Sequence, residues 1–240
     1  DDVLVALADP CDEDGDAISG RVRAVPAHAS PDALQAGRFG LKAGQPSVLR
    51  QIGAALNRDM GVTTSLYPRL DQESEAQGEP ELAPEDLELM RRYVSLLGVP
   101  ARRALSDAQS LRGEELFVEA SCDSCHITTL YTGAHHPYVE LRNQTIHPFT
   151  DLLLHDMGPG LADSLEQPDV AASEWRTPSL WGIGLTVGVS GSESYLHDGR
   201  ARTLEEAILW HGGEAEASKG AFRQLPRDER EALVAFLKSL

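Results

Sequence analysis

The sequence feature that most constrains this chain is the run Cys122-Asp123-Ser124-Cys125-His126, a C-x-x-C-H motif. Two thiols three positions apart can form thioethers to the two vinyl groups of a single porphyrin. The next residue, His126, is then held under the iron as its proximal ligand. The motif therefore predicts one covalently bound haem c, attached through Cys122 and Cys125.

The residues before the motif carry a helical pattern. Apolar or small side chains recur at i, i+3, i+4 and i+7, namely Gly113, Leu116, Phe117 and Ala120. This pattern predicts a helix with one apolar face that runs directly into the attachment site.

Three other interpretations of the two cysteines remain open at this point. A thioredoxin-like C-x-x-C follows a strand, whereas this one follows a predicted helix. A structural zinc site needs further Cys or His ligands. His135 and His136 are near in sequence, but the only other cysteine, Cys11, is distant. The last alternative is a disulfide between Cys122 and Cys125. The five-residue match favours haem over all three.

Composition excludes several function classes. The chain of 240 residues has 38 acidic and 21 basic residues, a formal net charge of −17. This charge disfavours nucleic acid and anionic lipid as partners, and it suits a basic redox partner protein. No apolar run approaches the length of a membrane span. Covalent haem is normally attached outside the cytoplasm, so we expect a periplasmic or extracellular protein whose signal peptide has been removed.

Helix signals predict a mainly α fold. We expect helices near 47–60, 84–98, 203–211 and 226–240, and an exposed acidic loop over 71–85. One face of the helix near 84–98 is expected to lie in the core through Leu87, Met90, Val94 and Leu97. Residues 106–240 follow the pattern of a class I cytochrome c domain, with first and last helices that cross at Gly113. Residues 1–105 are expected to form a helical and loop extension packed on this domain. Residues 130–200 form a long insertion rich in Gly and Pro.

An acidic run near the N-terminus resembles the start of a calcium-binding loop. Asp12, Asp14 and Asp16 alternate as in such loops. Ala17 stands where the sharp turn needs Gly, and no Glu follows at the twelfth position. A solvated acidic turn is therefore favoured over a calcium site.

The second axial ligand of the iron has five candidates, namely Met157, His147, His155, His197 and His211. Spacing alone does not choose among them. Thr203 and Glu206 form a capping box that starts a helix, and Gly212-Gly213 ends it directly after His211. A ligand fixed in this way can hold its imidazole rigidly. Met157 remains a close alternative because Met is a common partner in high-potential haems.

A resemblance to a known superfamily adds to this choice. Residues 106–240 resemble the C-terminal haem domain of bacterial di-haem cytochrome c peroxidases and of the methylamine-dehydrogenase maturation enzyme. The matching segments are Cys122–His126, Arg176–Leu180, Tyr195–Gly199, Thr203–Ala207 and the closing helix. In those enzymes the distal ligand lies fourteen residues after the His of the His-Asp-Gly motif. Counted from His197, the resemblance implies His211. The peroxidases usually have Met there, so a His would give a bis-histidine haem of lower potential.

The chain is more similar to the branch named di-haem oxidoreductases, also called thiol oxidoreductases. The similar segments are Gly37–Gly40, Asp59–Thr64, Thr145–Gly158, Trp181–Gly184 and Leu209–Gly213. Such proteins carry a second C-x-x-C-H in an N-terminal domain, whereas this chain has one. It therefore resembles the C-terminal portion of such a protein.

The resemblance implies a function for this portion. In the di-haem peroxidases, peroxide reacts at the N-terminal haem and the C-terminal haem relays electrons. We therefore expect an electron-transfer domain that works with a second haem, and a chain that is inactive toward peroxide by itself. The alternative is a stand-alone mono-haem electron carrier. Arg176, Arg200 and Arg202 are candidates to bind haem propionates, with surface ion pairing as the alternative role.

Overall fold

The structure is a computed structural model that describes residues 2–27, 33–70, 78–164, 167 and 169–240. Two compact units divide the chain. The first spans Val22–Gly98, and the second combines Asp2–Arg21 with Val99–Leu240. Helices predominate over short strands, as the sequence predicts. The packing of residues 1–105 on a haem domain stays a prediction.

The first unit contains a hairpin and two helices. Strands β1 (Ala24–Pro26) and β2 (Leu34–Ala36) pair antiparallel. Helix α2 (Val48–Met60) has its N-cap at Ser47, whose Oγ accepts a hydrogen bond from Arg50 N at 3.3 Å. It ends at Gly61, where φ is +67°, a left-handed conformation that favours glycine. The predicted helix at 47–60 is therefore confirmed.

Helix α3 (Pro84–Ser95) begins with Pro at its first position, as predicted, and ends three residues before the predicted end at 98. Leu87 is buried with Ile52 and Leu56 of α2. Met90, Val94 and Leu97 form the rest of the stripe predicted to face the core. That prediction is wrong for these three, whose exposed fractions are 37%, 40% and 54%. Of the predicted acidic loop, residues 71–77 lie outside the described residues.

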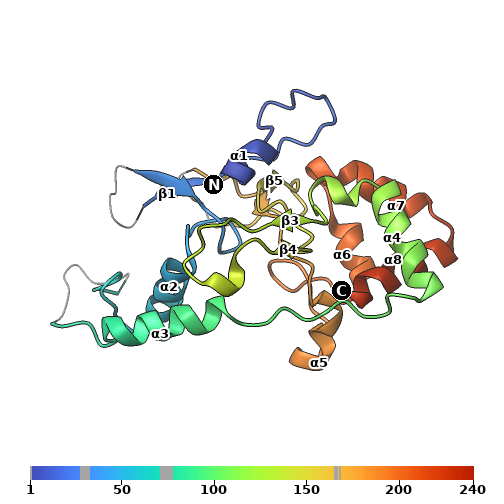
Figure 1. The fold of residues 1–240 in the computed structure, drawn as a ribbon. Helices are drawn as coiled ribbons and strands as arrows, with labels where there is room; N and C mark the ends of the chain where they lie inside the picture. Colours follow the sequence, from blue (N-terminus) through green and yellow to red (C-terminus); the bar gives the residue numbers. More distant parts are fainter. Residues whose placement is uncertain (1, 28–32, 71–77, 165–166, 168) are drawn as a thin grey trace. The chain divides into compact units, whose positions relative to one another are not determined.

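The second unit is built on the crossing of α4 (Ala108–Glu119) and α8 (Arg227–Ser239), shown in green and red in Figure 1. A Cβ added to Gly113 would lie 2.0 Å from the carbonyl oxygen of Ala232. Only glycine allows the two backbones to approach this closely. The predicted crossing at Gly113 is thus confirmed within this unit.

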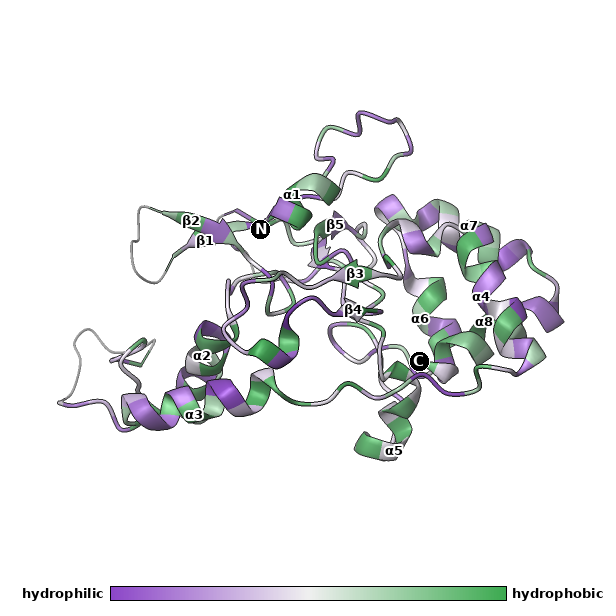
Figure 2. Cartoon of the chain, viewed as in Figure 1, coloured by the Kyte–Doolittle hydropathy of each residue, from purple (hydrophilic) through white to green (hydrophobic). Residues whose placement is uncertain are grey.

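Helices α6 (Leu204–Trp210) and α7 (Glu216–Gln224) pack against this pair around one apolar core. Figure 2 shows the helices as alternating bands of hydrophobic and hydrophilic residues, the pattern of one buried face and one solvent face. The apolar residues of the closing helix, Leu233, Phe236, Leu237 and Leu240, are all buried here. The buried core residues on these helices are Leu116, Phe117, Leu204, Ala207, Phe222, Ala232, Leu233, Phe236 and Leu237, with Leu240 at the end.

Short elements occupy the chain between α4 and α6. Two antiparallel pairs form here, β3 (Leu130–Tyr131) with β4 (Thr145–Ile146), and β5 (Leu154–Asp156) with β6 (Glu174–Arg176). The other elements are η1 (Cys122–Ser124), η2 (Val139–Leu141), η3 (Ile183–Leu185) and α5 (Thr186–Ser190), with η4 (Gly213–Ala215) after α6. This irregular region corresponds to the predicted insertion at 130–200.

The N-terminal part of the second unit begins with α1 (Asp2–Leu7) and continues as an acidic loop. Carboxylate oxygens of Asp9, Asp12 and Asp14 lie within 4.8 Å of one another. Backbone amides of residues 16–18 donate to Asp12, Asp14 and Asp16 in local turns. A calcium ion at this loop stays a prediction.

Among the residues that the structure describes, none of the helices combines the length and apolar character needed to cross a membrane.

Candidate functional site

The C-x-x-C-H motif begins directly after α4. Ser121 has φ +56°, a left-handed conformation that turns the chain out of the helix. The next three residues form the single 3₁₀ turn η1, and His126 N donates to Cys122 O at 3.0 Å. Both cysteines of the motif are free thiols, and burial raises the pKa of Cys122 to about 12. The structure thus gives no support to the disulfide alternative.

The imidazole of His126 is oriented by one backbone carbonyl. Its Nδ1 lies 2.9 Å from the carbonyl oxygen of Phe149, so Nδ1–H donates and Nε2 is the nitrogen able to bind a metal. Burial and, to a smaller extent, the charge of His211 lower the pKa of His126 to about 4. The hydrogen bond to Phe149 acts in the opposite direction but is outweighed. The neutral ring favoured by this environment is the form that ligates metals.

His211 has the same arrangement. It is the C-cap residue of α6, and its Nδ1 lies 2.8 Å from Ala207 O one helical turn earlier. Nδ1–H therefore donates and Nε2 is left to bind a metal. Burial lowers the pKa of this ring too. Two partly buried imidazoles, each oriented by a backbone carbonyl, thus lie within electrostatic range of each other.

The other four candidates for the second ligand have different surroundings. His147 is exposed, and its Nδ1 lies 3.1 Å from Thr129 Oγ1. His197 stacks on Trp175, with ring centroids 3.7 Å apart. Met157 is partly buried. Its backbone passes beside Gly212, the residue after His211, because a Cβ added to Gly212 would lie 3.1 Å from the carbonyl oxygen of Met157.

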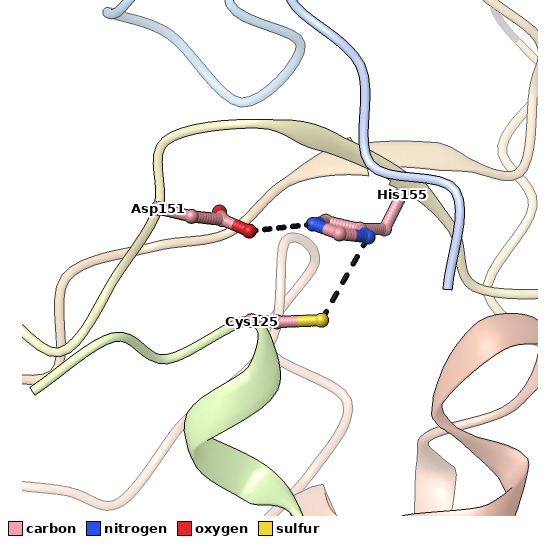
Figure 3. Close-up of side chains that lie close together, drawn as sticks. All are labelled: Cys125, Asp151 and His155. Carbon is pink, nitrogen blue, oxygen red and sulfur yellow. Dashed lines mark hydrogen bonds and ion pairs between the residues drawn. The ribbon is translucent and has the colours of Figure 1, made fainter. Parts of the chain in front are cut away.

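His155 has carboxylates at both ring nitrogens, those of Asp151 and Glu214. Figure 3 shows the Asp151 carboxylate at one of these nitrogens and the sulfur of Cys125 near the other. The Nε2 of His155 lies 2.8 Å from Asp151 Oδ2, and its Nδ1 lies 2.7 Å from Glu214 Oε2 and 3.7 Å from Cys125 Sγ. All three charged side chains are largely buried: the exposed fraction is 3% for His155, 2% for Asp151 and 11% for Glu214. Burial alone would lower the pKa of His155, but hydrogen bonds to Asp151, Cys125 and Glu214 raise it to about 12.

The loop that carries Asp151 has an unusual backbone. Phe149 and Leu152 have φ of +54° and +63°. Bulky residues in this region cost about 1–3 kcal/mol each, and such strain gathers at functional sites. Thr150 Oγ1 donates to Thr177 O at 2.7 Å, and Leu153 N donates to Asp151 Oδ1 at 2.9 Å. These bonds hold the loop in the conformation that presents the Phe149 carbonyl to His126.

Comparison with known proteins places the chain in a family. All of residues 1–240 match the family described as "Di-haem oxidoreductase, putative peroxidase". The chain belongs to the di-haem oxidoreductase family. No curated protein sequence matches it.

One solved structure has a similar fold. A structure of hydrazine synthase from Kuenenia stuttgartiensis, pressurised with xenon, superposes on this chain with a TM-score of 0.50. The match covers 92% of this chain and 68% of that one, at 20% sequence identity. At this identity the likeness concerns the fold alone.

The residues around the motif fit the cofactor that the family name implies. A covalent c-type haem needs two thiols at C-x-x-C spacing and a neutral imidazole directly after them. This chain has all three, together with a second imidazole whose Nε2 is able to bind a metal. The cluster of Cys125, Asp151 and His155 also has metal-binding atom types within 4.8 Å of one another. There, however, the carboxylates occupy both nitrogens of His155 as hydrogen-bond acceptors.

The predicted propionate-binding arginines have protein partners in this structure. Arg200 donates to Asp198 through Nε at 2.7 Å and to Gly160 O through Nη1 at 2.6 Å, and its guanidinium lies 4.9 Å from the ring of Trp210. Arg176 donates to Thr177 O at 3.0 Å, and burial lowers its pKa. Their roles toward propionates stay predictions.

Sequence reasoning named His155 only as a candidate ligand and did not name Asp151 or Glu214. Asp151 lies four residues before His155, a spacing that brings two side chains together on a helix. His155, however, is in strand β5, so the spacing did not indicate the contact. Glu214 is 59 positions beyond His155. Only the three-dimensional fold brings it there.

Proposed function

We propose that this chain is the electron-relay haem domain of a di-haem oxidoreductase, with one haem c attached through Cys122 and Cys125. His126 and His211 are its two axial ligands, and the second haem belongs to a part of the protein outside these 240 residues. The observation that carries the proposal is the matched pair of imidazoles: each donates Nδ1–H to a backbone carbonyl, at 2.9 Å and 2.8 Å.

Each protein group has a separate task in this function. Thioethers at Cys122 and Cys125 would hold the haem, and the carbonyls of Phe149 and Ala207 hold the two imidazoles in one tautomer and one orientation. A haem held in this way supplies a one-electron redox couple. Two neutral imidazole ligands favour a lower potential than a His/Met pair would give.

Six-coordination also bears on reactivity. Because His126 and His211 fill both axial positions in this proposal, peroxide meets no open site on this domain. The chain alone is therefore inactive toward peroxide, and reduction of a substrate takes place elsewhere in the whole protein. The excess of acidic residues, 38 against 21 basic, suits a basic electron-donor protein in the periplasm or outside the cell.

The second candidate function is a stand-alone mono-haem electron carrier. The observation in its favour is that C-x-x-C-H occurs once in the 240 residues. Intact mass and iron content of the native protein discriminate between the two functions. Two haems in a longer polypeptide support the relay domain, whereas a native chain of 26.0 kDa with one haem supports the carrier.

The haem itself is tested by extraction. After denaturation in acidified acetone, the haem should stay with the polypeptide, and the pyridine haemochrome spectrum should be that of a c-type haem. The double variant C122S/C125S should release its haem into the organic phase, whereas C11S should retain it. Release of haem from the wild-type protein would show that the attachment proposed here is wrong.

A further inference from the structure

The Asp151–His155–Glu214 cluster lies between the two segments that carry the proposed axial ligands. On the proximal side, Asp151 is in the loop that orients His126. Its backbone N–H donates to Cys125 O at 2.9 Å, two residues beyond the Phe149 carbonyl that accepts from His126. The loop that carries Asp151 is therefore joined to the attachment motif by one backbone hydrogen bond and by one hydrogen bond from the His126 side chain.

On the distal side, Glu214 follows His211 by three residues, in η4. Its carboxylate accepts from His155 Nδ1 at 2.7 Å and from Asp156 N at 3.0 Å. It also accepts from the backbone N and the Oγ of Ser19, both at 3.0 Å. Four donors thus fix the segment that directly follows His211.

The imidazole of His155 joins these two sides. A carboxylate only accepts hydrogen bonds, so a ring with carboxylates at both nitrogens donates from both and is a cation. Both bonds are charge-assisted, and the exposed fraction of the ring is 3%. Gly20 covers one side of it: a Cβ there would lie 2.5 Å from His155 Cε1 and 3.0 Å from Nε2. The ring is held by Asp151, Glu214 and the backbone at Gly20.

We propose that His155, clamped by Asp151 and Glu214, is a positioning residue that fixes the His211 segment relative to the His126 segment and so keeps both imidazoles on the iron. This inference rests on the proposed function, because it takes His126 and His211 as the axial pair. His155 does not touch the metal. It acts through the hydrogen bonds of Asp151 and Glu214, as outer partners of metal ligands do.

The test measures how often the distal position opens. Carbon monoxide binds reduced haem only where an axial position is free, so its apparent affinity reports the fraction of molecules in which His211 has dissociated. We expect H155Q to bind carbon monoxide at least about tenfold more tightly than wild type, the usual scale for losing an outer partner of a ligand. The oxidised variant should also show a larger high-spin fraction, with the haem still covalently attached.

Gly20→Ala provides a second test that removes no polar group. Its Cβ would push the imidazole away from Asp151 and Glu214, so the variant should also bind carbon monoxide more tightly. The matched control is Gly133→Ala, where an added Cβ has no atom within 4 Å. A second control, E114Q, breaks the ion pair between Glu114 on α4 and Arg102, in which Oε1 and Nη1 lie 2.7 Å apart. It lowers stability without acting on the cluster, so its carbon monoxide affinity should match wild type.

A milder variant guards against loss of folding. If H155Q does not accumulate with haem, Ser19→Ala removes one hydroxyl donor from Glu214 and should increase carbon monoxide affinity about threefold, the scale of one hydrogen bond. Unchanged affinity and spin state in both G20A and S19A would overturn the inference.

Failure of the proposed function gives a different result. A wild-type protein that is high-spin and binds carbon monoxide freely overturns the axial pair, and with it the role of His155. A low-spin wild type whose H211A variant opens, while H155Q and G20A behave as wild type, overturns the role of His155 alone.

Discussion

The α4–α8 crossing and the Asp151–His155–Glu214 cluster both border the C-x-x-C-H motif, and they hold it by different forces. The crossing is apolar: the rings of Phe117 and Phe236 are in edge contact, with their centroids 5.3 Å apart. Gly113 lies where the two helix backbones approach each other closely. The cluster is polar, buried and charged. A close-packed crossing fails when volume is added, whereas a buried ionic cluster fails when a partner is removed.

The largest effect is expected from adding volume at the crossing. Gly113→Ala puts a Cβ about 2.0 Å from Ala232 O, so the helices must separate, and we expect stability to fall by about 3 kcal/mol or more. Thermal unfolding followed by circular dichroism measures this loss. The control is Gly220→Ala on α7, where the added Cβ meets open space and helix propensity should raise stability by up to about 1 kcal/mol. Equal melting temperatures for the two variants would contradict the close crossing.

A smaller effect is expected from removing a partner in the cluster. Burial acts to raise the pKa of Glu214, whereas the hydrogen bond and the charge of His155 act to lower it. The lowering is larger, so the pKa of Glu214 lies below its ordinary value of 4.5. A lowered pKa in the folded state stabilises the protein above the ordinary pKa, and this contribution is lost as pH falls through the folded value. Glu214→Gln should therefore cost about 2 kcal/mol at pH 7.

Urea unfolding of wild type and E214Q between pH 7 and pH 3 checks this prediction. The difference in unfolding free energy should shrink as pH falls below the ordinary pKa of Glu, because wild type then also loses the carboxylate. A difference that stays constant over this range would show that the charge of Glu214 contributes nothing to stability.

The smallest effect is expected at the start of α6. Thr203 Oγ1 accepts from Glu206 N at 3.0 Å as the N-cap, so Thr203→Ala should cost about 1 kcal/mol. The cap acts at the opposite end of the helix from His211, so we expect the visible spectrum to stay as in wild type. A change of spin state without loss of stability would mean that the ligand is positioned from the start of α6, not by the cluster after it.

The elements of the helical frame could be predicted because their signals are local. Ser47, Pro84 and Thr203 mark helix starts, and the stripe through Leu116 and Phe117 marks a buried face. The crossing was expected from the pattern of a class I cytochrome c domain, and Gly113 on that face indicated where the backbones approach. The error on α3 has the same origin, because an apolar stripe shows that a face is suited to burial and not which neighbour covers it.

The polar cluster could not be predicted because its partners are distant in sequence. Ser19, the stretch from Asp151 to His155, and Glu214 come from three segments, and each polar residue alone is compatible with a solvent-exposed position. The positive φ at Phe149 and Leu152 left no mark in the sequence either, since both are bulky residues that rarely adopt it. The two thiols and His126, in contrast, are predicted as haem-binding residues by one five-residue motif.

The most direct test of the axial pair is the spin state of His211→Ala beside the control His147→Ala, which changes an exposed imidazole. The oxidised wild-type protein should be low-spin and should lack the weak red charge-transfer band that marks methionine ligation. H211A should be high-spin, with the haem still bound through Cys122 and Cys125, whereas H147A should match wild type. An H211A protein with an unchanged low-spin spectrum would contradict the account, and loss of that spectrum in a Met157 variant would assign the distal position to Met157.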